Sequence, residues 1–455
     1  MSVTLVLWLL IVAGLSVLTL QRAAYGVALY LFTFFVNPTF WPWGEPIENI
    51  RWNLLAALIL LIGVALQGSR SDRAKPEGMA WSTAVGFAAV LMMVNAIAVH
   101  VTLAPKPRVS IVLLILLIKY VILYFTMTAA IRKKEDLRLV VWSVVLCASY
   151  IGYQATINNA GRIQGGRLEN IGAAGVQNAN ELASLLLAVV PLGGYLFLTG
   201  TRREKILAAL TTPLVLNVIL LCNSRGALLA LILAAITIVA MAPKGARRKV
   251  LKGLGLGAVA LVLLLRDPEI VERFLTVFVD AEERDSSAKA RMLIWTGALM
   301  QIRDYPFGAG GESFSWVFGD KYLPEAGLAS GGRAVHNGYL NEATNWGIQG
   351  LFLRLLFYGL GLLAVRQMTR RCAKAGDVDG ALLGVCLISA TIAVLVSAVF
   401  GDYLDDDWGI WMVALMVSHA TLYASQPAFA ETTVVALPVG TKALPAAVSA
   451  QSAPN

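Results

Sequence analysis

The sequence predicts an all-α polytopic integral membrane protein. Of its 455 residues, 58% are hydrophobic and only 14% are charged, whereas a soluble globular protein has about 45–50% apolar and about 25% charged residues. The apolar residues also gather in runs about as long as the hydrocarbon core of a bilayer is thick. A soluble domain of this composition would expose large apolar patches. These observations argue against a cytosolic enzyme, a secreted disulfide scaffold and a nucleic-acid-binding domain.

The apolar runs predict 12 or 13 transmembrane helices. The weakest run, 23–37, contains Gly26 and ends at Asn37-Pro38, so it fits a tilted or re-entrant element as well as a span. The first run lacks a preceding basic segment and a small-residue cleavage site, which favours a retained span over a cleaved signal peptide. The side of the N-terminus stays open. In chain order the runs cover residues 3–20, 23–37, 53–67, 79–102, 109–131, 139–157, 181–200, 206–222, 226–242, 252–265, 347–366, 381–400 and 408–424.

Lysine and arginine form four clusters, which all fall on one side of the membrane when the spans between them are counted. The positive-inside rule makes that side cytoplasmic, and the clusters also suit anionic lipid headgroups. They account for much of the net charge of +9, so we expect the lipid bilayer, and no nucleic acid, as a partner. The clusters are Arg132-Lys133-Lys134, Arg202-Arg203-Lys205, Lys244-Arg247-Arg248-Lys249-Lys252 and Arg366-Arg370-Arg371-Lys374.

This count divides the chain into four regions. Residues 1–265 form a transmembrane helical region, 266–346 a loop domain on the non-cytoplasmic side, and 347–424 the C-terminal transmembrane helices. The tail 425–455 has almost no charge and is rich in Ala, Pro, Ser and Val, which predicts disorder. Long ordered loops are usually functional, and the loop domain 266–346 shows helical patterning over Ala290–Ile302.

Two polar motifs on the non-cytoplasmic side carry the strongest chemical signal. His336, shortly before the span that starts near Gly347, suits a general base because an imidazole titrates near neutrality. The alternative is an interfacial histidine that bonds the backbone. Arg225 lies in a polar break between two apolar runs, where an arginine is costly unless it is paired or faces water. Its planar fork suits phosphate oxygens, although a snorkelling arginine in a short hairpin is the alternative.

Five further residues are candidates with common structural alternatives. Arg291 lies about one turn into the helical part of the long loop, where a solvated surface charge is the usual reading. Asn180 and Glu181 stand at the edge of an apolar run, where they could cap a helix or sit in the headgroup layer, and Asn337 follows His336. Lys119, midway along its apolar run, is costly to bury. It could meet a lipid phosphate or extend its stem to the interface.

No metal site and no cofactor are predicted. The four cysteines are scattered and form no CxxC or Cys/His cluster, so neither a metal site nor a disulfide framework is indicated. An acidic cluster lies outside the membrane by the topology count; its spacing could bind a cation, but a solvated acidic loop is the preferred interpretation. It consists of Asp402, Asp405, Asp406 and Asp407.

Several motifs, taken in chain order, resemble the O-antigen ligase/polymerase family of bacterial envelope enzymes. The resemblance covers roughly residues 160–365, with the long loop between two late spans, and it rests on the ordered set of motifs. Asn37-Pro38 with Trp41, Trp43 and Gly44 also resembles the exosortase-associated branch. The motifs are Asn178–Ala183, Ser224-Arg225-Gly226, Ser286–Arg291 leading into Trp295, Asp304–Gly310 and His336–Leu340.

The resemblance implies a GT-C-like fold and a metal-independent glycosyltransferase that uses an undecaprenyl-diphosphate-linked glycan donor. It implies that His336 deprotonates the acceptor hydroxyl, and that Arg225 and Arg291 hold the diphosphate and stabilise its charge as it leaves. Asn180, Glu181, Asn337 and Lys119 are expected as supporting residues. A direct one-step displacement would invert the anomeric centre.

The function predicted on this basis is that of an O-antigen ligase, which transfers a glycan to the lipid A core. We expect it in the bacterial inner membrane with its active site facing the periplasm. An O-antigen or exopolysaccharide polymerase and a protein O-glycosylation ligase of the same fold stay open as alternatives. An alternative of another class is a transporter of a lipid-linked or anionic solute, which Lys119 and Arg354 keep in consideration. A transporter should carry its polar residues near mid-membrane at paired broken helices.

Overall fold

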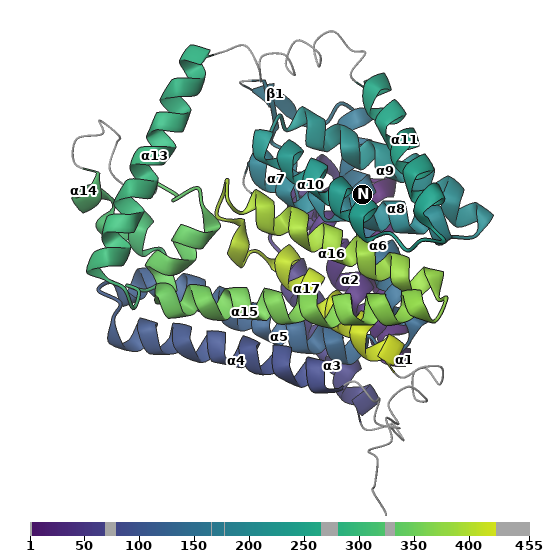
Figure 1. Cartoon of the computed structure of the whole chain (residues 1–455), viewed down its shortest axis with the longest axis horizontal. Coiled ribbons are helices and arrows are strands. Elements are labelled where there is room, and N and C mark those ends of the chain that lie inside the picture. Colours follow the sequence, from purple (N-terminus) through teal and green to yellow (C-terminus); the bar gives the residue numbers. More distant parts are fainter. Residues whose placement is uncertain are drawn as a thin grey trace, which may run out of the picture.

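The computed structural model describes residues 2–68, 79–164, 166–176, 178–264, 281–323 and 333–424, and these are helical almost throughout. The tail predicted for 425–455 lies outside the described residues. The helices are α1 (Val3–Gln21), α2 (Ala24–Phe35), α3 (Trp52–Gly68), α4 (Met79–Thr102), α5 (Pro107–Ala130), α6 (Lys134–Thr156), α7 (Ala179–Leu187), α8 (Val189–Thr199), α9 (Arg202–Leu221), α10 (Arg225–Met241), α11 (Arg247–Leu264), α13 (Ala281–Asp304), α14 (Gly319–Tyr322), α15 (Gly338–Lys374), α16 (Val378–Ser397) and α17 (Asp407–Ala424). The short helical turns are η1 (Pro38–Phe40), η2 (Pro42–Ile47), η3 (Phe314–Phe318) and η4 (Tyr403–Asp405). Figure 1 shows the long helices as a bundle, with α13 standing across one end.

Many of these helices have the length and composition of membrane spans. Among the described residues, eight helices are long and apolar enough to cross a membrane, and three shorter apolar helices accompany them. One of the shorter ones contains α2, whose 12 residues extend only about 18 Å, less than the roughly 30 Å of a hydrocarbon core. Ten of its residues are buried. The run predicted as the weakest span therefore packs inside the bundle instead of against lipid.

The basic clusters gather at one end of the bundle, which we call the basic end. Lys134 Nζ lies 3.9 Å from an oxygen of Asp377, between α15 and α16, and Arg138 forms an ion pair of 2.9 Å with Glu204 at the start of α9. The third cluster, Lys244–Lys252, joins them because a Cβ on Gly253, beside Lys252, would lie 3.3 Å from the side chain of Leu198 in α8. The common side predicted for the four clusters matches this arrangement.

The first and last helices run from the other end of the bundle to the basic end. We call that other end the loop end; it contains residues 38–47, 162–169 and 398–406. Trp8 in α1 donates a hydrogen bond of 2.8 Å to the carbonyl of Val36 there, while Arg22, after α1, pairs with Asp136 at the basic end. In α17, the Tyr423 ring lies 4.1 Å from the ammonium of Lys134. Both α1 and α17 therefore begin at the loop end.

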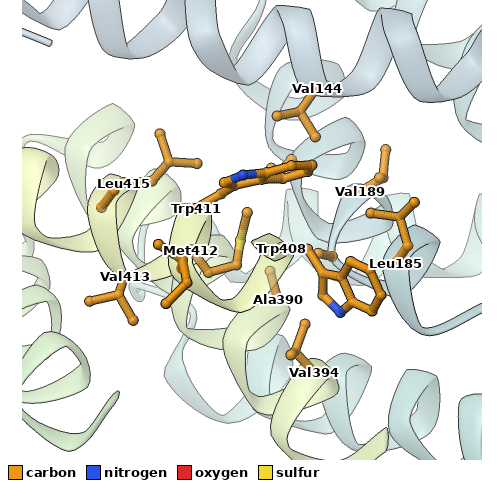
Figure 2. Packing of buried hydrophobic residues seen from close by; sticks show 14 of the residues in the cluster. Val144, Leu185, Val189, Ala390, Val394, Trp408, Trp411, Met412, Val413 and Leu415 are labelled. Atoms are coloured by element: carbon orange, nitrogen blue, oxygen red, sulfur yellow. The ribbon is translucent and has the colours of Figure 1, made fainter. Parts of the chain in front are cut away.

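Helix α17 forms the centre of the bundle. Trp408 and Trp411 are each 1% exposed, and Figure 2 shows them among Val144 of α6, Val189 of α8 and Val394 of α16. Nearly every residue of α17 is buried. A helix that is hydrophobic on all sides belongs in an interior, so the neighbouring helices enclose α17 and fix where its first residues emerge at the loop end.

The polar connection before α7 contains the β-structure of the described chain. Strands β1 (Arg162–Gln164) and β2 (Arg167–Glu169) form an antiparallel hairpin with Ile163 opposite Leu168. The all-α prediction thus holds for the described residues except at this hairpin. The predicted span 181–200 corresponds to α7 and α8, which together form one apolar helix over Ala179–Thr199 that is long enough to cross a membrane.

Helix α15 is broken at Gly347, where φ is 84° and ψ is 171°. The glycine-rich segment after α13 is bonded to this break: Ala309 N–H donates to Thr344, Gly310 N–H to Asn345, and Ile348 N–H to Pro306. The motif Asp304–Gly310 and the start of the predicted span therefore form one structure. It attaches α13 to the first part of α15 at the loop end.

Replacing Gly347 by alanine is expected to destabilise the protein. Its backbone conformation is essentially restricted to glycine and costs other residues about 1–3 kcal/mol, and a Cβ would lie 2.5 Å from the carbonyl carbon of Phe307. Gly359→Ala, in the same helix, is the matched control because nothing lies within 4 Å of the added Cβ. The melting midpoint of the purified protein should fall for Gly347→Ala only. Equal midpoints for the two variants would contradict the assignment of this break.

Candidate functional site

The segment between α16 and α17, residues 398–406, is the floor of the candidate site. Gly338 N–H at the start of α15 donates to the carbonyls of Ala398 (2.8 Å) and Gly401 (2.9 Å). A Cβ on Gly226, at the start of α10, would lie 2.8 Å from the Phe400 side chain. The first turns of α10 and α15 thus meet on this segment, although more than a hundred residues separate them.

A third helix, α7, contacts the end of α16 directly before this floor. The hydroxyl of its Ser184 lies 2.7 Å from that of Ser397. All three helices start with side-chain caps, from Asn178 to α7, Ser224 to α10 and Asn337 to α15. Helix N-termini carry partial positive charge and favour anions. The three capped N-termini around residues 398–406 therefore make this end of the bundle suitable for a phosphate group.

His336 immediately precedes α15 and has a left-handed backbone, with φ of 55°. Its backbone N–H donates to Asp402 at 3.3 Å, and that of Asn337 donates to the same carboxylate at 3.0 Å. The imidazole itself lies at the surface. Desolvation, followed by the charges of Arg291 and Arg333, lowers the pKa of His336. A lowered pKa keeps the imidazole neutral near pH 7, which is the form that accepts a proton.

Asp402 is a site residue that the sequence interpretation missed. Burial, followed by the charge of Asp405, raises the pKa of Asp402 to about 7, and the N–H groups of His336 and Asn337 partly oppose this shift. The acidic cluster was interpreted as a solvated loop, and the structure corrects this. Asp402, Asp405 and Asp406 are half-buried and Asp407 is buried, because the segment is enclosed by the helix starts that pack on it.

Arg291 lies on α13, and its charge acts on His336. Its positive charge lowers the pKa of His336 and also partly offsets the raised pKa of Tyr403, in the floor segment. A small hydrophobic cluster explains the proximity: Ile294, one turn after Arg291, packs with Val335, the residue before His336. Ala298 and Phe314 complete this cluster. The structure thus brings Arg291 and His336 to one place from two separate segments.

Arg225 is the first residue of α10 and its side chain is exposed at the loop end. Asn223, two residues earlier, has a left-handed backbone (φ 46°) and its amide donates to the Gly166 carbonyl at 3.4 Å. This contact ties the start of α10 to the β-hairpin. Gly226 contacts Phe400 of the floor segment. The preceding residue, Arg225, therefore lies at the edge of this segment, which also contains Asp402.

The predicted supporting residues divide into two groups. Asn337 caps α15, accepting from the N–H groups of Tyr339 and Leu340, so its side chain is structural. Asn180 and Glu181 lie in the first turn of α7, and their N–H groups donate to Asn178. Burial raises the pKa of Tyr403, and the charge of Glu181 adds to this shift, which places this turn beside the floor of the site.

Lys119 and Arg354 are not part of this site. Lys119 lines a separate cavity bounded by α2, α3 and α5. Arg354 is 1% exposed and makes two hydrogen bonds to the carboxylate of Glu342, at 3.1 and 3.3 Å. Within the described ranges, no group of three or more His, Cys, Asp or Glu side chains is arranged to hold a metal ion. The candidate site instead offers an imidazole, a carboxylate, two guanidinium groups and three helix N-termini.

Part of the chain matches a known protein family. Residues 210–355 match the family model described as O-antigen ligase, Wzy_C. No curated protein matches the chain. The matched segment runs from α9 into α15 and contains Arg225, Arg291 and His336, whereas Asp402 and Glu181 lie outside it. The family predicted from the ordered motifs is therefore confirmed over this part of the chain, and this match together with the apolar helices supports a multi-pass membrane protein.

Proposed function

We propose that this chain, which carries the O-antigen ligase family domain, is an O-antigen ligase. It transfers a glycan from undecaprenyl diphosphate to the lipid A core oligosaccharide. The observation that carries the proposal is the placement of His336, with its lowered pKa, beside Asp402 and within the field of Arg291. The family match supports a lipid-linked glycan donor and a lipid acceptor in general terms.

In the proposed reaction, the neutral imidazole of His336 takes the proton of an acceptor hydroxyl. The acceptor oxygen bonds to the anomeric carbon as the bond from that carbon to the diphosphate oxygen breaks, which inverts the anomeric centre. Arg225, Arg291 and the helix N-termini around residues 398–406 stabilise the charge that develops on the diphosphate, as fixed dipoles and charges do in other active sites. Asp402 positions His336 by accepting its backbone N–H.

The proposed orientation places the site in the periplasm and the protein in the bacterial inner membrane. The basic end holds the lysine and arginine clusters, and the positive-inside rule assigns such an end to the cytoplasm. His336, Arg225 and Asp402 lie at the loop end, far from those clusters along the helices. A donor flipped to the outer leaflet would present its diphosphate at this level.

The role of Arg291 is tested by Arg291→Lys, because lysine keeps the charge but loses the planar fork that matches a diphosphate. We expect a loss of about 10²-fold in the transfer rate, on the scale of removing one transition-state donor. The assay uses purified protein, the carrier-linked glycan and lipid A core, with the product resolved on a gel. Arg303→Lys is the matched control, since Arg303 is exposed at the far end of the same helix. Equal rates for the two variants would remove Arg291 from the mechanism.

A polymerase and a protein O-glycosylation ligase would use the same site, so the three activities differ in the acceptor that receives the glycan. In a deletion strain, loss of all O-chain from lipid A core with normal polymer on the carrier supports the ligase. Short single-repeat chains identify a polymerase, and an unchanged lipopolysaccharide with loss of protein glycosylation identifies the third activity. The transporter reading loses its support, because Arg354 is paired with Glu342 and Lys119 does not lie on a broken helix.

A further inference from the structure

A cavity of about 620 Å³ lies between α2, α3 and α5 at the loop end. His336, Arg225 and Arg291 do not line it. Its volume is in the range of small-molecule and cofactor sites. Charged and polar groups come from the segment before α3, from the middle of α5 and from Asp407, and leucine and isoleucine side chains of α3 and α5 form a large part of the remaining wall.

The charged residues of the cavity lie at the depth where helices begin. The Tyr120 hydroxyl donates to Asp407 Oδ1 at 3.3 Å, and Asp407 is the first residue of α17. Lys119, next to Tyr120, is therefore level with the start of α17, and Arg51 directly precedes α3. Arg51 and Asp407 each stand where an apolar helix begins, which is where lipid headgroups lie.

The cavity offers two cations to an anionic group. Arg51 and Lys119 both line it and both have exposed side chains. Neither takes part in an ion pair with another described residue. A guanidinium and an ammonium that face one cavity at headgroup level suit the oxygens of a phosphate.

The cavity also offers acceptors that require N–H or O–H donors. Asp407 accepts from Tyr30 (3.2 Å) and Tyr120 (3.3 Å), and a carboxylate has about four lone-pair sites, so its capacity is not exhausted. The side-chain oxygen of Asn53 is buried and has no partner among the described residues. Glu48 adds a second carboxylate to the lining. A primary ammonium, which has three N–H donors, complements these groups, whereas a trimethylammonium has none.

An apolar surface continues from the cavity. Leu54 (45%), Leu58 (48%) and Ile122 (45%) line it and are exposed. They belong to α3 and α5, two helices that also contact each other. Exposed apolar side chains in the wall of a charged cavity suit the acyl chains of a lipid.

We propose that this cavity binds a zwitterionic phospholipid with a primary ammonium headgroup, of the phosphatidylethanolamine class. Its phosphate contacts Arg51 and Lys119, its ammonium contacts Asp407, and its acyl chains lie along Leu54, Leu58 and Ile122. The site is separate from the transfer site, so the proposal does not depend on the chemistry proposed for His336.

The test is native mass spectrometry of the purified full chain in detergent, titrated with phosphatidylethanolamine, phosphatidylcholine, phosphatidylglycerol and undecaprenyl phosphate. We expect phosphatidylethanolamine to bind at least tenfold more tightly than phosphatidylcholine. The double variant Arg51→Gln/Lys119→Gln should lose at least tenfold in that affinity. Arg108→Gln, an exposed arginine in the first turn of α5 that does not line the cavity, should bind as the wild type does. Melting midpoints confirm that each variant is folded.

A further variant separates the two halves of the headgroup. Asp407→Asn should abolish the preference for phosphatidylethanolamine over phosphatidylcholine, while phosphate-dependent binding persists. Wild-type affinity in the Arg51/Lys119 double variant would overturn the site. Equal binding of phosphatidylcholine and phosphatidylethanolamine to the wild type would overturn the ammonium assignment. Displacement of phosphatidylethanolamine by undecaprenyl phosphate at lower concentration would assign the cavity to the carrier lipid and also overturn the proposal.

Discussion

Replacing His336 by alanine is expected to lower the rate of glycan transfer by about 10²- to 10⁴-fold, the range that one general base contributes. The imidazole is exposed, and the hydrogen bonds that hold this residue in place come from its backbone N–H and its neighbour's. The substitution therefore removes the base and leaves the attachment to Asp402. The measurement is single-turnover transfer from the carrier-linked donor to lipid A core.

A second substitution guards against a trivial loss of structure. His336 has a φ of 55°, a conformation that asparagine tolerates better than alanine does. His336→Asn should keep the fold and the melting midpoint of the wild type, and it should be as inactive as His336→Ala. Transfer at near-normal rate in either variant would remove His336 as the base. Inactivity accompanied by a lowered melting midpoint in both would identify a structural residue instead.

Arg354→Met is expected to destabilise the protein by about 3–5 kcal/mol, because it leaves the buried carboxylate of Glu342 without its partner. Arg354 and Glu342 are each 1% exposed and are joined by two hydrogen bonds. Twelve residues separate them, which in a straight helix is about 18 Å. The pair is close because α15 is broken at Gly347, so it also holds the segment that begins with the Asn337 cap.

The double variant Glu342→Leu/Arg354→Met distinguishes the ion pair from simple packing. Replacing both charges of a buried pair by apolar groups is often neutral or stabilising, so the double variant should recover most of the loss caused by Arg354→Met. The measurement is the unfolding midpoint of the purified protein in one detergent. An Arg354→Met variant as stable as the wild type would show that Glu342 does not depend on this arginine.

Much of the architecture could be predicted from the sequence, because apolar runs and basic clusters depend only on composition along the chain. Arg291 and His336 could also be singled out, since each belongs to a motif that keeps its place in the order. Their proximity could not be derived from the residues. It depends on Ile294 and Val335 meeting in a small cluster, and such tertiary contacts leave no periodic signal.

Asp402 shows why other parts of the site escaped prediction. An acidic segment between two spans has the composition of a solvated loop, and only the helix starts that pack on residues 398–406 bury it. The neighbouring elements, and not the local sequence, determine its environment.

The directions of α1 and α17 have a consequence for the number of membrane crossings. The segment from Val3 to Ala424 starts at the loop end and finishes at the basic end, as the contacts of Trp8 and Tyr423 show. A path whose two ends lie on opposite faces must cross an odd number of times. Of the 12 or 13 crossings that hydropathy predicts, 13 has this parity, so we propose 13 crossings, with the short α2 crossing inside the bundle and not against lipid.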